Sequence, residues 1–334
     1  MSPVRAGVVG TGSIGKNHAR VLSEMPDADF AAIYDIDVGV AREIAKKYGA
    51  KAAGTLEEFA SLIDAATVAT PTATHFEIAK FLLERRKHVL VEKPISENTA
   101  DAHELSRLAH QHRLVLQVGH IERFNPVLSA LEARLTRPRF IESHRLSPYP
   151  NRSTEIGVVL DLMIHDLEII LHLVRSPVKS IDAVGVPVLS RCEDIANARL
   201  RFENGCVANI TVSRISPEKL RKIRVFQENA YLSLDYQAQE GFMFRLAETN
   251  APESSLLKKL LSAKESAIVS EFAGRKIVRE PVEIEKDEPL KRELASFLEC
   301  ARAGSTPKVS GHQATAALEL ALEITGLIEG SSGR

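Results

Sequence analysis

Short apolar runs alternate with amphipathic stretches through the first third of the chain, from Val4 to about Gly119. This alternation predicts a parallel sheet covered by helices on both faces. The predicted strands are residues 4–9, 29–35, 50–53, 65–69, 88–92 and 114–118. The predicted helices between them include residues 38–48, 57–63, 74–86 and 99–112. Asp37 and Asn98 stand directly before two of these helices, where side-chain caps are expected.

Beyond Gly119 the pattern changes to β-rich runs that follow one another with short turns. Strands are expected at residues 140–146, 180–189, 196–202, 207–215, 220–227, 231–236 and 242–246, with an edge strand at 276–284. Helices are expected at residues 126–135, 158–174, 254–269, 288–303 and 312–328. The turn Glu203-Asn204-Gly205 is typical of a hairpin. Successive strands with short turns indicate a mostly antiparallel sheet, so the fold class is α/β followed by α+β.

The length of 334 residues exceeds the size at which one hydrophobic core usually keeps growing. We therefore expect two domains, residues 1–120 and 121–334, with the last helix packing back near the first domain. Hydrophobic residues make up 44% of the chain, charged residues 26%, and the net charge is −1. This balance is typical of a soluble globular protein and indicates no nucleic-acid surface, and no apolar run is long enough to span a membrane.

Cys192, Cys206 and Cys300 lie far apart, without the spacing of a metal site. They indicate reduced thiols in a cytoplasmic protein, and nothing at the N-terminus resembles a signal peptide. We therefore expect a cytoplasmic protein without a bound metal.

One glycine-rich turn organises the first domain. The apolar run from Val4 ends in GxGxxG, the pattern of a strand that turns into a helix and binds a pyrophosphate at the helix N-terminus. The predicted cofactor-binding residues of this turn are Gly10, Thr11, Gly12, Ser13, Ile14 and Gly15. The first domain is thus predicted to be a dinucleotide-binding Rossmann domain.

The next strand ends in Asp35, about 20 residues after the last glycine, where a ribose-binding acid is expected. A carboxylate there accepts hydrogen bonds from the adenosine ribose and repels a 2′-phosphate, which favours NAD over NADP. The alternative is that Asp35 or Asp37 only caps the following helix; we assign the ribose to Asp35 and the cap to Asp37.

Two later strands run into polar residues beside a proline. These are Thr70, Pro71, Thr72 and His75 after one strand, and Glu92, Lys93 and Pro94 after the other. Both groups follow the carboxyl ends of strands, the edge at which open α/β sheets bind ligands. The alternative to a ligand site is that both strands simply end at a proline and that the polar residues there are solvated.

The apolar helix predicted over residues 158–174 carries Asp161 and His165 four positions apart on one face, with His172 two turns below His165. Buried polar groups need partners. Asp161 and His165 could form a buried pair that only stabilises packing. Alternatively, they could form a catalytic pair.

In this order, the motifs resemble the glucose-fructose oxidoreductase / inositol dehydrogenase / MocA (Gfo/Idh/MocA) family, over nearly the whole chain. The resemblance implies an NAD-dependent oxidoreductase that acts on a CH–OH group. It also implies an open C-terminal sheet that supports the substrate and forms the interface of a homodimer or homotetramer. By the same resemblance, His165 is the base, Lys93 stabilises the reacting oxygen, and Asp161 orients His165 or contacts the substrate. Thr70, Pro71, Thr72, His75, Glu92 and Lys93 would line the nicotinamide half.

The stretch from Gln117 to Pro126, QVGHIERFNP, looks like members of the family that oxidise UDP-N-acetylglucosamine at C3. A diphosphate needs cationic partners, and the candidate substrate contacts are Lys93, Arg123, Asn125, Arg145, Arg152, Asp161 and His165. Arg123 and Asn125 could instead contact the cofactor, and Arg145 and Arg152 could be surface residues. Oxidation of a free sugar or inositol is the alternative activity, and a non-catalytic regulator that senses a dinucleotide is a third hypothesis.

Overall fold

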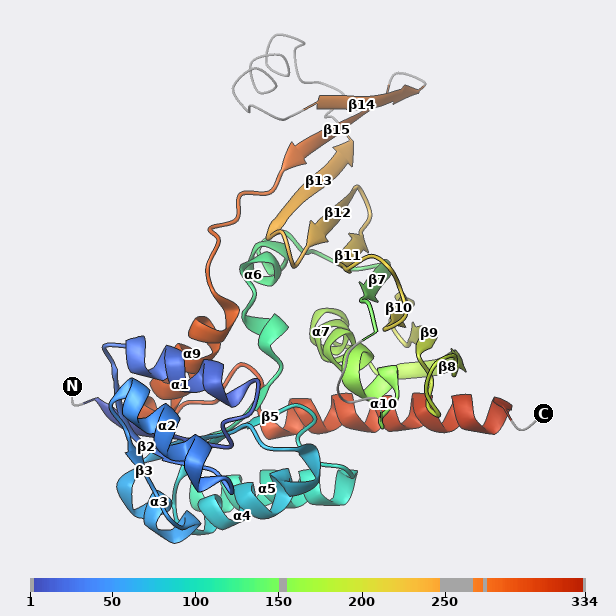
Figure 1. Ribbon diagram of the computed structural model, residues 1–334. Helices are drawn as coiled ribbons and strands as arrows, with labels where there is room; N and C mark the ends of the chain where they lie inside the picture. Colours follow the sequence, from blue (N-terminus) through green and yellow to red (C-terminus); the bar gives the residue numbers. More distant parts are fainter. Residues whose placement is uncertain (1–2, 150–154, 247–266, 273–274, 333–334) are drawn as a thin grey trace. The chain divides into compact units, whose positions relative to one another are not determined.

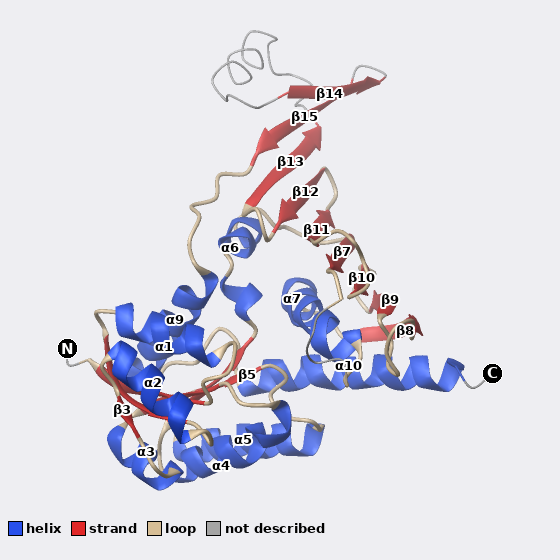
Figure 2. Cartoon of the chain, viewed as in Figure 1, coloured by secondary structure: helices blue, strands red, loops and turns tan. Residues whose placement is uncertain are grey.

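The computed structural model describes residues 3–149, 155–246, 267–272 and 275–332 (Figure 1). The chain divides into two compact units. The first contains Met1–Phe124 and Asp287–Glu319, and the second contains Asn125–Lys286 and Leu320–Arg334. Each unit has its own β-sheet, and the helices of each lie against that sheet (Figure 2).

A six-stranded sheet forms the centre of the first unit, in the order β3-β2-β1-β4-β5-β6. Its strands all pair in parallel, and the order reverses direction between β1 and β4. The strands are β1 Val4–Val9, β2 Ala28–Tyr34, β3 Lys51–Ala52, β4 Ala65–Val68, β5 His88–Glu92 and β6 Leu116–Gly119. This is the predicted Rossmann topology, and ligands bind such sheets beyond the strand ends at the reversal point.

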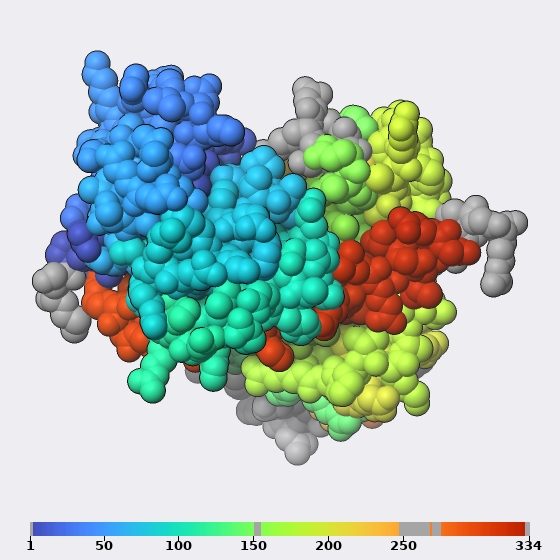
Figure 3. Space-filling view, turned by 90° about the horizontal axis from the view of Figure 1, so that it is seen from below, coloured from blue at the N-terminus to red at the C-terminus, as the bar shows by residue number. Residues whose placement is uncertain are grey.

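Helices cover both faces of this sheet (Figure 1). On one face lie α1 Gly15–Glu24, α2 Val38–Tyr48 and α9 Pro289–Ala303. On the other lie α3 Leu56–Leu62, α4 His75–Glu84 and α5 Thr99–His112, and the space-filling view shows their side chains, blue to cyan, as a continuous surface (Figure 3). As predicted, Asp37 caps α2 by accepting hydrogen bonds from Gly39 N and Val40 N, and Asn98 caps α5.

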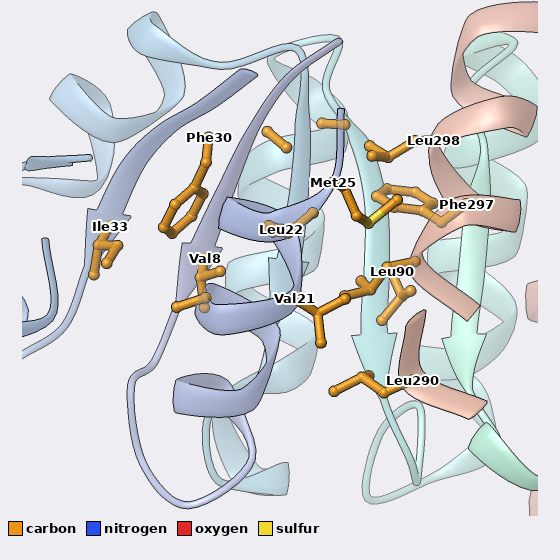
Figure 4. Close-up of a cluster of buried hydrophobic side chains, with 14 of the residues drawn as sticks. Val8, Val21, Leu22, Met25, Phe30, Ile33, Leu90, Leu290, Phe297 and Leu298 are labelled. Atoms are coloured by element: carbon orange, nitrogen blue, oxygen red, sulfur yellow. The ribbon is translucent and has the colours of Figure 1, made fainter. Parts of the chain in front are cut away.

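The core of the first unit includes a helix from late in the chain. Leu294 and Phe297 of α9 are fully buried and belong to the same cluster as Leu22, Met25 and Leu90 (Figure 4). Sequence reasoning placed all of residues 121–334 in one domain, whereas Asp287–Glu319 groups with the N-terminal part. The physical reason for this grouping is that the apolar face of α9 is buried in the hydrophobic core of the first unit.

The second unit is built on a nine-stranded sheet in the order β14-β15-β13-β12-β11-β7-β10-β9-β8. The strands are β7 Phe140–Leu146, β8 Val178–Val186, β9 Ile195–Phe202, β10 Val207–Ser213, β11 Leu220–Phe226, β12 Ala230–Asp235, β13 Glu240–Leu246, β14 Ala267–Phe272 and β15 Arg275–Pro281. Among the described strands of this second sheet, only β7 and β10 pair in parallel. The expected open, mostly antiparallel sheet is confirmed.

Two predictions near the end of this sheet were wrong. The strand predicted at 276–284 as an edge is β15, which lies between β13 and β14, so that β14 is the edge. Of the helix predicted at 254–269, residues 254–266 lie outside the described part of the chain, and 267–269 belong to β14. Strand β14 pairs with β15, and this pairing supplies backbone hydrogen-bond partners that the pattern of side chains in the sequence does not reveal.

One face of the second sheet is covered by helices α6 Pro126–Glu132 and α7 Ile164–Val174 (Figure 1). The ring nitrogen Nε2 of His172 on α7 lies 2.7 Å from Glu132 Oε1 on α6. The opposite face carries a row of aromatic rings on neighbouring strands. Their centroids are 5.6 Å apart between Phe140 and Phe226, 4.8 Å between Phe226 and Tyr231, and 4.4 Å between Tyr231 and Phe244.

The last helix, α10, spans Gly311–Ser332, and its residues up to Glu319 group with the first unit. Glu319 Oε1 lies 2.9 Å from His103 Nε2 on α5. A Cβ atom at Gly311 would lie 2.6 Å from Ser106 Oγ, so the start of α10 packs closely on α5. None of the described helices is both long enough and apolar enough to cross a lipid bilayer.

Candidate active site

The glycine-rich turn joins β1 to α1 at the edge where the sheet reverses its order. Gly10 has φ of +85°, a conformation that side chains rarely adopt. A Cβ atom on Gly15 would lie 1.8 Å from the carbonyl oxygen of Gly10. The start of α1 therefore lies against the turn too closely for any side chain at this position.

The outer side of this turn is open. A Cβ atom on Gly12 would meet nothing within 4 Å, and Ser13 and Ile14 are exposed. Helix α1 has no side-chain cap at Ile14 and no acidic residue in its first turn. The first turn of α1 therefore brings no carboxylate of its own to the positive end of the helix dipole, which fits the pyrophosphate of a dinucleotide.

Asp35 follows β2 and is held by the glycine-rich turn. Its Oδ2 accepts hydrogen bonds from Thr11 N at 2.6 Å and Thr11 Oγ1 at 2.7 Å, and its Oδ1 accepts one from Asp37 N at 2.9 Å. Burial opposes ionisation of Asp35, but these hydrogen bonds and the charge of Lys16 lower the pKa of the carboxyl below its usual value. A fixed, partly exposed carboxylate beside the turn fits a ribose of NAD.

His75 braces the loops that follow β4 and β5. Its Nδ1 lies 2.8 Å from Pro94 O and its Nε2 lies 2.9 Å from Thr70 O, while the ring is buried. Burial lowers the pKa of His75, and the two carbonyl groups oppose this effect. Because both ring nitrogens face backbone oxygens, His75 ties together the loops after β4 and β5, and its place beside the cofactor stays a prediction. Pro71 is exposed and Thr72 partly so, at the surface of the same loop.

The strand ends of β5 and β6 place Lys93 beside a histidine that sequence reasoning did not single out. Glu92 pairs in register with Gly119, so Lys93 and His120 leave adjacent strands at the same edge. Burial and the positive charges of Lys93 and Arg123 lower the pKa of His120 to about 3. A neutral imidazole thus lies near the Lys93 ammonium. His120 could have been identified from the sequence, because it directly follows an apolar strand.

Glu92 itself points inward. Its Oε1 lies 3.0 Å from Nε2 of His18 on α1, and His18 is fully buried. This contact joins β5 to α1, and the lining of the nicotinamide half by Glu92 stays a prediction.

In the second unit, Asp161 and His165 lie where the helix changes its geometry. Val159–Met163 form a π-helical turn and α7 begins at Ile164, so the single α-helix predicted over 158–174 was wrong at its start. The wider turn changes the rotation between Asp161 and His165 and removes the basis for placing them on one α-helical face. Both side chains are partly exposed. Such π-turns are frequent at functional sites.

An ion pair anchors α7 immediately after His165. Arg145 Nε donates to Asp166 Oδ2 at 2.7 Å, and Ser143 Oγ donates to Asp166 Oδ1 at 2.6 Å. Arg145 is 4% exposed, so its guanidinium is committed to this pair and the predicted role as a substrate cation does not fit. Breaking a buried ion pair costs about 3–5 kcal/mol. Arg145 thus fixes the helix that carries His165.

Asn125 and Arg123 also differ from the expected substrate contacts. Asn125 caps α6 by accepting a hydrogen bond from Val127 N at 3.1 Å, and it donates to Tyr236 O at 3.1 Å. Arg123 is 4% exposed within the first unit. Arg152 lies outside the described residues.

No three His, Cys, Asp or Glu side chains of the described residues are placed to hold a metal ion. The three cysteines, which all lie in the described part of the chain, form no disulfide.

Two family models match the chain. Residues 4–120 match the oxidoreductase family with an NAD-binding Rossmann fold, and residues 128–233 match the GFO/IDH/MocA C-terminal domain. A UDP-N-acetylglucosamine 3-dehydrogenase from Acidithiobacillus ferrooxidans is 35% identical over 237 residues, which are 71% of this chain and 75% of the relative. The chain belongs to the Gfo/Idh/MocA family of oxidoreductases. Its cofactor is NAD, as predicted from the glycine-rich turn and Asp35.

A solved structure and one further curated relative extend the comparison. The solved structure of UDP-N-acetylglucosamine 3-dehydrogenase GnnA from A. ferrooxidans superposes with a TM-score of 0.86 at 29% identity, covering 99% of both chains. A scyllo-inositol 2-dehydrogenase from Bacillus subtilis is 24% identical over 343 aligned positions, covering 96% of this chain and 93% of the relative. The likeness to family dehydrogenases thus extends over both units.

Asp35 and Asp37 offer a matched pair for testing the ribose site. We expect Asp35→Ala to weaken NAD binding by about 10- to 100-fold and to reduce discrimination against NADP, because the ribose loses a charged acceptor, a bond of about 1.5–3 kcal/mol. Asp37→Ala should lower stability by about 1 kcal/mol through loss of the α2 cap, with cofactor preference unchanged. Calorimetric titration measures the affinities of each variant for NAD and NADP, and thermal unfolding measures the stability of Asp37→Ala. Equal NAD:NADP ratios in the wild type and Asp35→Ala would remove Asp35 from cofactor selection.

Proposed function

We propose that this oxidoreductase oxidises the C3 hydroxyl of a UDP-N-acetyl amino sugar, such as UDP-N-acetylglucosamine, to a ketone. The observation that carries the proposal is the likeness to a relative of that name, at 35% identity over 71% of the chain, together with a TM-score of 0.86 to the solved structure. The stretch QVGHIERFNP at residues 117–126 is the local sequence that first suggested this substrate.

The chemistry assigned to the chain is removal of one proton and one hydride from a secondary alcohol. NAD supplies the hydride acceptor when it is bound. We assign proton removal to His165, since a neutral imidazole accepts a proton near neutral pH. Lys93 is assigned to the reacting oxygen, where its positive charge stabilises the developing alkoxide. Asp161 orients His165 or accepts a hydrogen bond from a sugar hydroxyl.

The buried basic residues receive different roles in this proposal from those expected at first. Arg145 holds Asp166 and so positions the helix of His165. Burial, with the positive charges of Lys93 and Arg123, keeps the imidazole of His120 neutral. His120 therefore adds no positive charge of its own beside Lys93.

A free sugar or inositol is the second candidate substrate, favoured by the likeness to scyllo-inositol 2-dehydrogenase over 96% of the chain. A dinucleotide-sensing regulator fits less well, because the lysine and histidine with catalytic roles, Lys93 and His165, are both present. The three unpaired cysteines support a reducing, cytoplasmic setting.

We also propose that the chain forms a homodimer or homotetramer through the outward face of the second sheet. The aromatic row of Phe140, Phe226, Tyr231 and Phe244 lies on this face, because Ser143 and Arg145 of β7 point the other way, to Asp166 of α7. The edge strand β8 exposes Val184 and Val186, and its neighbour β9 exposes Ile195. Aromatic and aliphatic side chains gathered on one sheet face are typical of a homo-oligomeric interface.

The first experiment measures NADH formation from NAD with UDP-N-acetylglucosamine, its uronic acid, free sugars and inositols, with a keto trap to draw the reaction forward. We expect absorbance at NADH wavelengths only with the UDP-sugars. Signal only with free sugars or inositols would move the assignment to the second candidate. Binding of NAD without turnover of any of these alcohols would contradict the proposed dehydrogenase.

Loss of the catalytic groups should affect turnover and leave the cofactor bound. We expect Lys93→Ala and His165→Ala each to lower kcat by about 10²–10⁴-fold, the usual contribution of acid–base groups, while NAD affinity changes little. His172→Ala, on the same helix as His165 but paired with Glu132, serves as the control and should stay near wild-type activity. Steady-state kinetics with calorimetric NAD titration separates the effects. A variant that keeps wild-type turnover excludes its residue from the mechanism.

Charge placed in the aromatic row should break the proposed oligomer. Tyr231→Glu puts a carboxylate between Phe226 and Phe244, where desolvation in an interface would be costly. Light scattering should show a shift of the molar mass toward the monomer, with circular dichroism unchanged. Gln111→Glu, at an exposed position of α5, introduces the same charge away from the aromatic row and serves as the control. A monomeric wild type, or an unchanged mass for Tyr231→Glu, would refute an interface on this face.

A further inference from the structure

A second buried carboxyl group lies near Glu92, and the assigned chemistry does not use it. Glu293 on α9 is fully buried, and within the described residues neither carboxyl oxygen has a hydrogen-bond partner. Its backbone oxygen accepts a hydrogen bond from Gln117 Nε2 of β6 at 3.2 Å. Orphaned polar atoms in a core are costly, so this carboxyl calls for an explanation.

Glu92 connects the elements that hold the cofactor and the lysine. Its carboxyl reaches His18 on α1, the helix that begins at the glycine-rich turn, at 3.0 Å. A Cβ atom on Gly119 would lie 2.8 Å from Glu92 Cδ, so the carboxyl occupies the space beside a glycine of β6. Lys93 is the next residue in the chain. A displacement of Glu92 would therefore disturb both Lys93 and α1.

The surroundings of Glu293 oppose its ionisation. Burial and the negative charge of Glu92 raise the pKa of Glu293 well above its usual value, which favours the neutral acid. The other polar groups on the adjoining elements are His18 of α1, Gln117 of β6, and Glu122 and Arg123 of the short helix η2, Ile121–Phe124, which packs on α9. A protonated Glu293 places no second negative charge beside the contact between Glu92 and His18.

We propose that Glu293 is a positioning residue whose retained proton keeps Glu92 against His18, and thereby holds Lys93 and the start of α1 in the arrangement that binds NAD. Loss of this proton would place two carboxylates together in a medium of low dielectric constant, where their repulsion is strong. Glu92 would leave His18, and the glycine-rich turn and Lys93 would lose a common anchor. NAD affinity is therefore coupled to one proton on the alkaline side.

The sign of the effect follows from the raised pKa. Because the pKa of Glu293 is raised, the binding-competent arrangement is present below that pKa and is lost as the pH rises through it.

Calorimetric titration of the full chain with NAD, from about pH 7 to about pH 10, tests the coupling. For the wild type we expect the Kd to rise about tenfold over this range, which corresponds to a coupling of one pKa unit. Glu293→Gln has nearly the same shape and cannot ionise, so it should bind NAD as the wild type does at neutral pH and lose the alkaline rise. Glu299→Gln, on the exposed side of α9, should keep the wild-type profile.

Infrared difference spectra of the wild type against Glu293→Gln supply an independent reading at neutral pH. The carbonyl stretch of a protonated carboxyl should be present in the wild type and absent from the variant. Its absence from the wild type would overturn the proposal, and so would identical pH profiles of NAD affinity in the wild type and Glu293→Gln. A uniform loss of affinity at every pH would indicate a structural role only. These readouts involve no sugar, so they fail or succeed separately from the proposed substrate.

Discussion

The close approach of α1 to the glycine-rich turn is the constraint on which the first unit depends. Gly15 lies against the carbonyl oxygen of Gly10, where a Cβ atom would be only 1.8 Å away. This contact puts the helix N-terminus at the point where the sheet order reverses, and Asp35 is tied to the same turn through Thr11. The predicted phosphate and ribose sites thus both adjoin one packing contact. The buried pair of His18 and Glu92 extends the connection to the strand that carries Lys93.

In the second unit, several contacts hold the partly exposed side chain of His165 in a defined place. A sheet covered on one face by α7 provides the scaffold, and Asp166 secures the helix one residue after His165 through Arg145 and Ser143. The π-turn at Val159–Met163 precedes it, and Glu193 Oε1 accepts a hydrogen bond from Val159 N at 3.2 Å. These contacts restrict the start of α7 from both sides. In each unit, then, buried polar groups position the candidate reactive side chain.

The fold and the cofactor site could be predicted where local spacing carries the information. Parallel strands with helices between them have their own periodicity, and the turn at Gly10 and the acid Asp35 occur at intervals imposed by one strand–turn–helix unit. The predictions that were wrong depend on distant partners. The edge strand was misplaced because β14 pairs with β15 through the backbone, and Arg145 was misassigned because its partner Asp166 lies on another element.

The sequence by itself determined the fold class, the family resemblance, the NAD site and the candidate pair of Lys93 and His165. It did so because these features rest on residue types at short, regular intervals. Only the tertiary structure decided that α9 belongs to the first core, that His75 braces two loops, and that Glu293 is buried near Glu92. Burial and charge pairing arise from contacts between residues far apart in the chain, and no local pattern of hydrophobic and polar positions specifies which of them will meet.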